Sequence, residues 1–210
     1  MRLELGKRAR CSDGAARELV DLVVDADSSR VTHLVVQPEN DPEAARLVPL
    51  DLAEVGANDE ISLRCTTQEL EEMSLVHEHA LLRAGERAEK EDGWDVGARD
   101  MQVIPDYSPA PFAGDLASEV IVSYDRVPTG EIELRHASAI YSADQHHLGS
   151  VDGVVVDADG MISHLLLERG HLWWKREISI PAAAIAELST DMVTLGVKKG
   201  ELGAFPSVPD

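Results

Sequence analysis

The sequence contains nearly the same phrase twice. Residues 25–36 read DADSSRVTHLVV and residues 157–167 read DADGMISHLLL, so that Asp157 follows Asp25 by 132 residues. The same offset relates three later pairs: Pro49 and Pro181, Asp59 and Asp191, and Leu63 and Leu195. A register that holds across separate segments predicts an internal duplication of a unit of roughly 70 residues.

Each unit is predicted to consist of β-strands, because its apolar runs are short, rich in Val, Ile and Leu, and bounded by turn residues. The runs lie at 19–24, 31–36, 47–49 and 60–65 in the first unit, and at 151–156, 161–168, 176–181 and 192–197 in the second. An Asp-rich or Asp-Gly turn joins the first two runs of each unit, which is typical of a hairpin. A proline ends each third run, and we expect a short helical turn after it, at 50–55 and 182–188. Several short strands in a small unit favour a closed or nearly closed barrel.

The second copy combines the Asp-Gly hairpin turn, the strand ISHLLL, a basic strand ending in Ile-Pro, the segment DMVTL and the terminal ELGAFP. Together these features resemble the PRC-barrel family. That family is named after the cytoplasmic part of the photosynthetic reaction centre H subunit, and it includes the C-terminal domain of the 16S ribosomal RNA maturation factor. Residues 124–206 are similar to bacterial tandem PRC-barrel proteins of unassigned role. The resemblance implies barrels that dock onto other proteins and share no common active site.

The predicted fold is mainly β, with two tandem small PRC-like β-barrels joined by a partly helical, irregular connector. The first barrel is expected at residues 1–74, the connector at 75–130 and the second barrel at 131–210. Within the connector, the pattern at 74–91 predicts a helix and the run at 119–124 predicts a strand. Because so small a barrel has little core of its own, we expect the connector to pack on the barrels. The alternative is a floppy linker. The expected anchors are Trp94, Ile104, Phe112, Val120 and Val122.

A net charge of −20 repels phosphate backbones, so no direct nucleic-acid contact is expected. No run approaches the roughly 18 to 20 apolar residues that span a bilayer, and the first residues lack the apolar core of a signal peptide. These observations predict a cytoplasmic protein without a membrane span. Two cysteines are too few for a disulfide scaffold. Cys11 and Cys65 are therefore expected to be small apolar filler, with a disulfide between them as the alternative.

The sequence contains no recognisable catalytic pattern. The sequence has no G-x-S-x-G, no glycine-rich phosphate loop, and no CxxC, HExxH or EF-hand spacing. We therefore predict no enzyme, no cofactor and no metal site. His33 and His164 occupy matching places in the two copies, and a structural role for them is favoured over a shared site.

The loop after the second hairpin, ERGHLWWKR, concentrates aromatic and basic side chains. Aromatic residues and Arg are the usual anchors of protein interfaces, and the corresponding loop of the first copy, PENDPEAAR, is acidic and lacks any aromatic residue. An interface, internal packing and RNA contact remain open for this loop. The candidate partner-binding residues are Arg169, His171, Trp173, Trp174, Lys175 and Arg176.

The sequence thus predicts a non-enzymatic protein-binding or scaffold module that docks onto a protein complex or onto itself. The alternative is a small-molecule or metal-responsive protein that uses the His-rich second barrel. Five of the eight histidines fall there: His136, His146, His147, His164 and His171. A ribosome-assembly accessory factor is a weaker alternative, with contact through ribosomal protein and not RNA. The sequence specifies neither a small-molecule ligand nor an oligomeric state.

Overall fold

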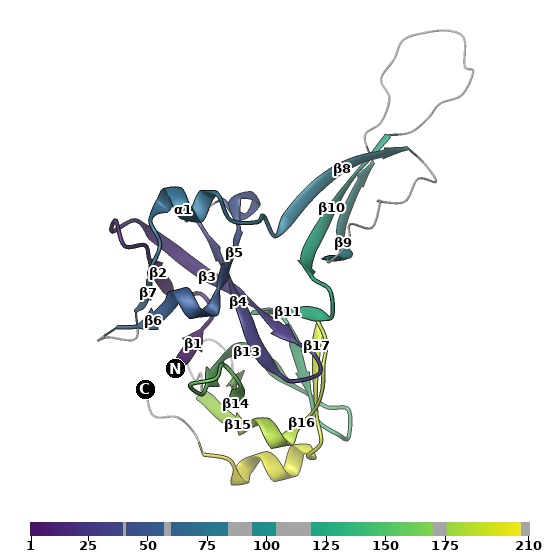
Figure 1. Ribbon diagram of the computed structural model, residues 1–210. Helices are drawn as coiled ribbons and strands as arrows, with labels where there is room; N and C mark the ends of the chain where they lie inside the picture. The colour runs from purple at the N-terminus through teal and green to yellow at the C-terminus, as the bar shows by residue number, and fades with distance from the viewer. Residues whose placement is uncertain (40, 57–59, 84–93, 104–118, 170–175, 207–210) are drawn as a thin grey trace, which may run out of the picture.

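The structure is a computed structural model that describes residues 1–39, 41–56, 60–83, 94–103, 119–169 and 176–206 (Figure 1). It confirms a mainly β fold. The strands of the first half are β1 (Arg2–Glu4), β2 (Arg8–Arg10), β3 (Ala16–Asp25), β4 (Arg30–Gln37), β5 (Arg46–Pro49), β6 (Ala53–Val55) and β7 (Ile61–Leu63). Those of the second half are β11 (Glu131–Arg135), β12 (Ala139–Tyr141), β13 (His147–Val156), β14 (Ile162–Arg169), β15 (Arg176–Pro181), β16 (Ile185–Leu188) and β17 (Met192–Leu195).

The two halves have the same strand order. The first sheet runs β5-β4-β3-β2-β7-β6 and the second runs β15-β14-β13-β12-β17-β16. In each sheet one neighbouring pair is parallel, β2 with β7 and β12 with β17. This agreement is what the predicted duplication requires. Each sheet curls as a half-barrel, whereas closure into two separate barrels remains a prediction.

Local sequence explains the turns and the strand ends. Asp25 Oδ1 accepts hydrogen bonds from the backbone N–H groups of Asp27 and Ser28, at 3.1 and 2.7 Å, in the β3–β4 turn. Asp157 Oδ1 accepts hydrogen bonds from the backbone N–H groups of Asp159 and Met161 in the β13–β14 turn. β5 and β15 both end at proline, and a 3-10 helix follows each, at Leu50–Leu52 and Ala182–Ala184. The predicted hairpins are therefore confirmed. The helical turns are confirmed only over these three residues each, because the rest of the expected ranges forms strands β6 (Ala53–Val55) and β16 (Ile185–Leu188).

The first strand of each half pairs with the sheet of the other half. β1 lies antiparallel to β13, with Leu3 opposite Val154. β11 lies antiparallel to β3, with Leu134 opposite Leu22. The two pairings occupy equivalent places in the two copies, so the halves exchange strands reciprocally. No local pattern in the sequence predicts this strand exchange between the two halves.

The exchange produces one shared hydrophobic core. A single cluster of buried side chains contains Leu22 and Leu34 of the first half together with Val154 and Leu165 of the second. The core is almost entirely aliphatic, as the low aromatic content predicts. Because each sheet buries a strand of the other, the two halves form one packing unit.

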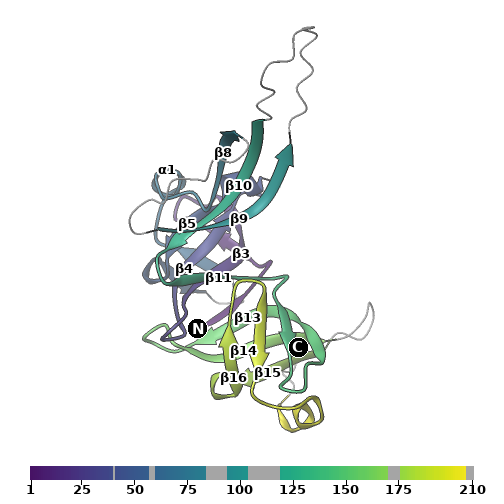
Figure 2. The same cartoon turned by 90° about the vertical axis from the view of Figure 1, so that its right-hand side faces the viewer.

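The connector forms a third sheet, of order β8-β10-β9, which projects from the two halves (Figure 2). Its strands are β8 (His77–Arg83), β9 (Trp94–Val103) and β10 (Glu119–Pro128). The expected helix at 74–91 is wrong over the described residues, since 77–83 pair along their whole length with β10. Strand pairing overrides a weak helical preference. The chain's described α-helix, α1 (Thr67–Glu71), lies earlier, and the strand expected at 119–124 is confirmed within β10.

The base of this third sheet packs on the outer face of the first half. Val76 and Val127 form a small apolar cluster with side chains of β3, β4 and β5, and Trp94 packs against it. The Arg126 guanidinium lies 4.4 Å from the centre of the Trp94 ring, a cation–π distance. Trp94 is thus an anchor, as predicted. Val120 and Val122 lie in β10, whereas Ile104 and Phe112 lie outside the described residues.

Candidate functional site

The candidate partner-binding loop joins two neighbouring strands of the second sheet. Arg169 is the last residue of β14, Arg176 is the first of β15, and the two are directly paired. His171, Trp173, Trp174 and Lys175 lie outside the described residues, so the assignment of this loop to a partner stays a prediction. The corresponding loop of the first half contains a 3-10 helix, Pro42–Ala44, with no buried residue.

The two matching histidines have matching neighbours. His33 Nδ1 lies 3.0 Å from Thr32 Oγ1, and His164 Nδ1 lies 3.2 Å from Ser163 Oγ. The Ser163 hydroxyl donates to the Val155 carbonyl oxygen at 2.9 Å. The Thr32 hydroxyl lies 3.2 Å from the equivalent Val23 carbonyl oxygen and donates more closely, at 2.6 Å, to Glu131 Oε2. Repetition of this local arrangement favours a structural role for both rings. His33 additionally lies 3.6 Å from Glu131 Oε2.

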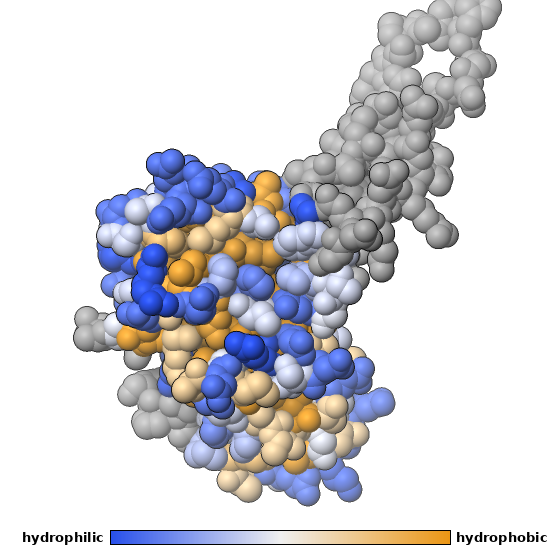
Figure 3. Space-filling model, in the orientation of Figure 1, coloured by the Kyte–Doolittle hydropathy of each residue, from blue (hydrophilic) through white to orange (hydrophobic). Residues whose placement is uncertain are grey.

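A groove of about 1150 Å³ lies beside the first of these histidines, at the junction of the two halves. Its ionisable side chains are those of Arg30, His33, Asp51, Glu131, Asp157 and Asp159. Carboxylates outnumber cationic groups there, which favours cationic over anionic molecules. On the face shown in Figure 3, hydrophobic residues lie between hydrophilic ones. Met192, 39% exposed, is the one large hydrophobic side chain classed as exposed in the described ranges.

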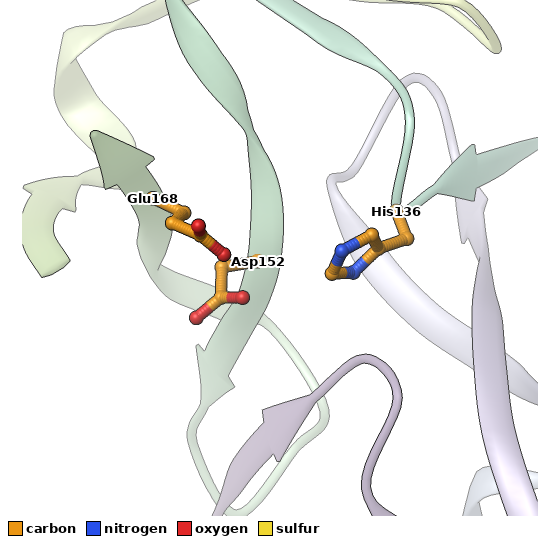
Figure 4. Close-up of side chains that lie close together, drawn as sticks. All are labelled: His136, Asp152 and Glu168. Carbon is orange, nitrogen blue, oxygen red and sulfur yellow. The ribbon is translucent and has the colours of Figure 1, made fainter. Parts of the chain in front are cut away.

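Three potential metal ligands converge on the second sheet. His136 follows β11, Asp152 lies in β13 and Glu168 lies in β14. One ligand atom of each lies within 4.8 Å of the others, and Figure 4 shows the His136 ring facing the two carboxylates. His136 is exposed, and both carboxylates are half-buried. An imidazole and two carboxylates can together bind a divalent metal ion.

The first half holds this cluster in place. The backbone N–H of His136 donates to Asp21 Oδ1 at 3.1 Å, and the backbone N–H of Leu5 donates to the carbonyl oxygen of Asp152 at 2.8 Å. Both bonds join one half to the other. The cluster therefore lies where the exchanged strands meet the sheets that receive them.

Basic side chains of the N-terminal segment lie in the same region. Arg2 forms ion pairs with Glu4 and with Glu177 of β15, both at 2.5 Å. Lys7 Nζ lies 3.0 Å from Glu4 Oε2, and the hydrogen bond and charge of Glu4 raise the pKa of Lys7. The region is thus an alternation of acidic and basic groups and not a uniformly negative patch.

Sequence reasoning missed the cluster of His136, Asp152 and Glu168. A local motif has its ligands close together in sequence. His136, Asp152 and Glu168 are separated by 16 residues at each step, and strand register brings them together. A comparison of the two copies does single out these three positions, because only the second copy has metal-binding residue types there. The equivalent residues of the first half are Leu5, Val20 and Gln37, none of which is a good metal ligand.

The sequence matches no protein-family model and no curated protein. None of the helices in the described part of the chain has the length and apolar character needed to cross a bilayer.

Proposed function

We propose that this protein is a non-enzymatic binding module that docks onto a protein complex or onto a second copy of itself. The docking surface in this proposal is the loop from Arg169 to Arg176. The protein works in the cytoplasm and has no direct nucleic-acid partner, in keeping with its net charge of −20.

The reciprocal strand exchange is the observation that carries the proposal. β1 is a strand of the second sheet and β11 is a strand of the first, so the halves cannot separate without breaking both sheets. The third sheet is fixed to this unit by Trp94, Val76 and Val127. A unit of this kind holds its surfaces at set distances, which is what a scaffold requires.

Two further features support docking through the loop. Two of the three tryptophans of the chain, Trp173 and Trp174, fall within it. The described surface exposes hardly any large hydrophobic side chain elsewhere, apart from Met192. The resemblance to PRC-barrels, whose known members dock onto proteins, agrees with this proposal. A role in ribosome assembly is its weaker form, with contact through a ribosomal protein.

The test compares the wild type with a Trp173→Ala, Arg176→Ala double variant. Affinity capture from a bacterial extract and sedimentation velocity of the pure protein measure partner binding and self-association. We expect the double variant to lose the partner or the oligomer and to keep the wild-type far-UV circular dichroism. A capture list and a sedimentation coefficient that both equal those of the wild type would overturn the proposal.

The first half offers a matched control. Glu39 and Asp41 are exposed in the corresponding loop, so a Glu39→Ala, Asp41→Ala variant changes the same place in the other copy. We expect this control to bind as the wild type does. Equal loss in both double variants would show that the loss is not specific to the loop from Arg169 to Arg176.

A further inference from the structure

The two halves use the same outer face differently. In the first half Val20 lies at a bulge of β3 and packs against the apolar cluster under the third sheet. In the second half the residue at the equivalent bulge of β13 is Asp152. Two other exchanges accompany this one, with Leu5 replaced by His136 and Gln37 by Glu168. The fold therefore accepts residues without metal-binding groups at all three places.

Two carboxylates of the second half lie close together at this face. Asp152 and Glu168 are half-buried, with carboxylate oxygens within 4.8 Å of each other. Glu168 is also paired directly with Glu177 across β14 and β15. Like charges opposite each other on neighbouring strands destabilise a sheet. Arg2 pairs with Glu177, Asp152 interacts with the charge of Lys7, and a cation between Asp152 and Glu168 would be attracted by both carboxylates.

The donor set selects the kind of cation. Imidazole nitrogen is a ligand typical of Zn²⁺ and similar transition metals, whereas Mg²⁺ and Ca²⁺ prefer oxygen alone. In a tetrahedral site, ligand atoms about 2.0 to 2.2 Å from one ion lie about 3.3 to 3.6 Å apart. The three ligand atoms lie within 4.8 Å of one another, so binding one ion requires side-chain movements of about 1 Å. The exposed His136 side chain has the freedom to close the difference.

We propose that His136, Asp152 and Glu168 form a binding site for one divalent transition-metal ion of the Zn²⁺ class. This site goes beyond the docking function and does not depend on it. Water completes the coordination, as in other three-ligand sites. Because His136 and Asp152 each bond through their backbone to the first half, the bound ion stabilises the junction between the halves.

Isothermal titration calorimetry of the full chain with ZnCl₂ tests the site. We expect saturable binding of one ion per chain and a higher melting temperature with Zn²⁺. The decisive variant carries the first-half residues, His136→Leu, Asp152→Val and Glu168→Gln, and is expected to lose both effects. Glu168→Gln alone is nearly isosteric, and it should weaken Zn²⁺ binding about tenfold or more while keeping the fold.

A second His–carboxylate pair provides the control. His146 Nδ1 lies 3.3 Å from Asp144 Oδ2 on the surface of the same half. A His146→Leu, Asp144→Asn variant should bind Zn²⁺ as the wild type does. Wild-type protein without a stoichiometric Zn²⁺ site would overturn the proposal. So would Zn²⁺ affinity unchanged in Glu168→Gln, or Ca²⁺ bound as tightly as Zn²⁺, which would indicate only a general acidic surface.

Discussion

The backbone N–H of Val31 donates to the carbonyl oxygen of Gly160 at 2.9 Å, and so joins the first turn of one half to the equivalent turn of the other. The reciprocal bond, from Ile162 N–H to the carbonyl oxygen of Ser29, measures 3.0 Å. Each residue of one bond lies 131 positions from its counterpart in the other. The two hairpins therefore meet about an approximate two-fold axis.

This meeting point predicts unequal effects on stability for two substitutions. Gly160 and Ser29 both have positive φ, 81° and 58°, and only glycine adopts such a conformation without strain. Gly160→Ser should lower the free energy of unfolding by about 1 to 2 kcal/mol. Its new Cβ would also lie 3.3 Å from the Val31 carbonyl oxygen. Ser29→Gly should change stability by no more than about 0.5 kcal/mol. Urea denaturation of both variants measures the difference, and a greater loss in Ser29→Gly would contradict it.

The exchanged strands predict a single unfolding transition. Leu134 is fully buried in the shared core. It lies in β11, the strand of the second half that pairs with β3 of the first half. Leu134→Ala should cost about 2 to 5 kcal/mol. Because the halves share one core, we expect calorimetry to show a single transition, in the variant as in the wild type, at a lower temperature in the variant.

Met192 supplies the control for this variant. Its side chain is 39% exposed, so Met192→Ala should stay within about 0.5 kcal/mol of the wild type. Two separate calorimetric transitions, of which Leu134→Ala shifts only one, would show that the halves unfold independently.

Two aspartates at equivalent places predict a dependence of stability on pH. Asp144 accepts a bond from the Lys199 backbone N–H at 3.1 Å, and Asp13 accepts one from the Thr67 backbone N–H at 2.8 Å. A hydrogen bond from Ser142 and the bond from Lys199 lower the pKa of Asp144 to about 2. Bonds from Thr67 lower the pKa of Asp13 in the same way.

A carboxyl group with a lowered pKa stabilises the folded state above its unfolded pKa, and this contribution disappears as the pH falls through the folded pKa. Asp144→Asn should therefore be less stable than the wild type at pH 7. The difference should shrink from about pH 4, the ordinary aspartate range, down to about pH 2. Thermal melts at a series of pH values measure it. A difference that is constant over this range would show that the charge of Asp144 plays no part.

Local patterns were enough to predict the hairpins, since Asp25 and Asp157 form their turn hydrogen bonds with residues only a few positions away. They were not enough to predict which strand β1 joins. β1 has three residues, and its central residue Leu3 pairs with Val154, which lies 151 positions later in the chain. Such a pairing depends on the register of the assembled sheets, which no local pattern records.

The same reason explains the candidate metal site and the connector. None of the three ligands belongs to a metal-binding motif that is local in sequence. The bulge at Asp152 and the pairing of Glu168 with β13 bring them together. In the connector, charges among scattered apolar residues suit a surface helix or an edge strand equally. The pairing of His77–Arg83 with β10 decided between them.

The two cysteines predict slow thiol chemistry in the folded protein. Cys11 and Cys65 are both free and buried, and burial raises the pKa of each thiol. Because the thiolate is the reactive form, we expect a disulfide reagent at pH 8 to react with both thiols quickly in denaturant and far more slowly in native buffer. In Cys11→Ala, Cys65 should remain protected, since its burial depends on the shared core. Rapid release of one equivalent from the native wild type would show that one of these thiols is accessible in solution.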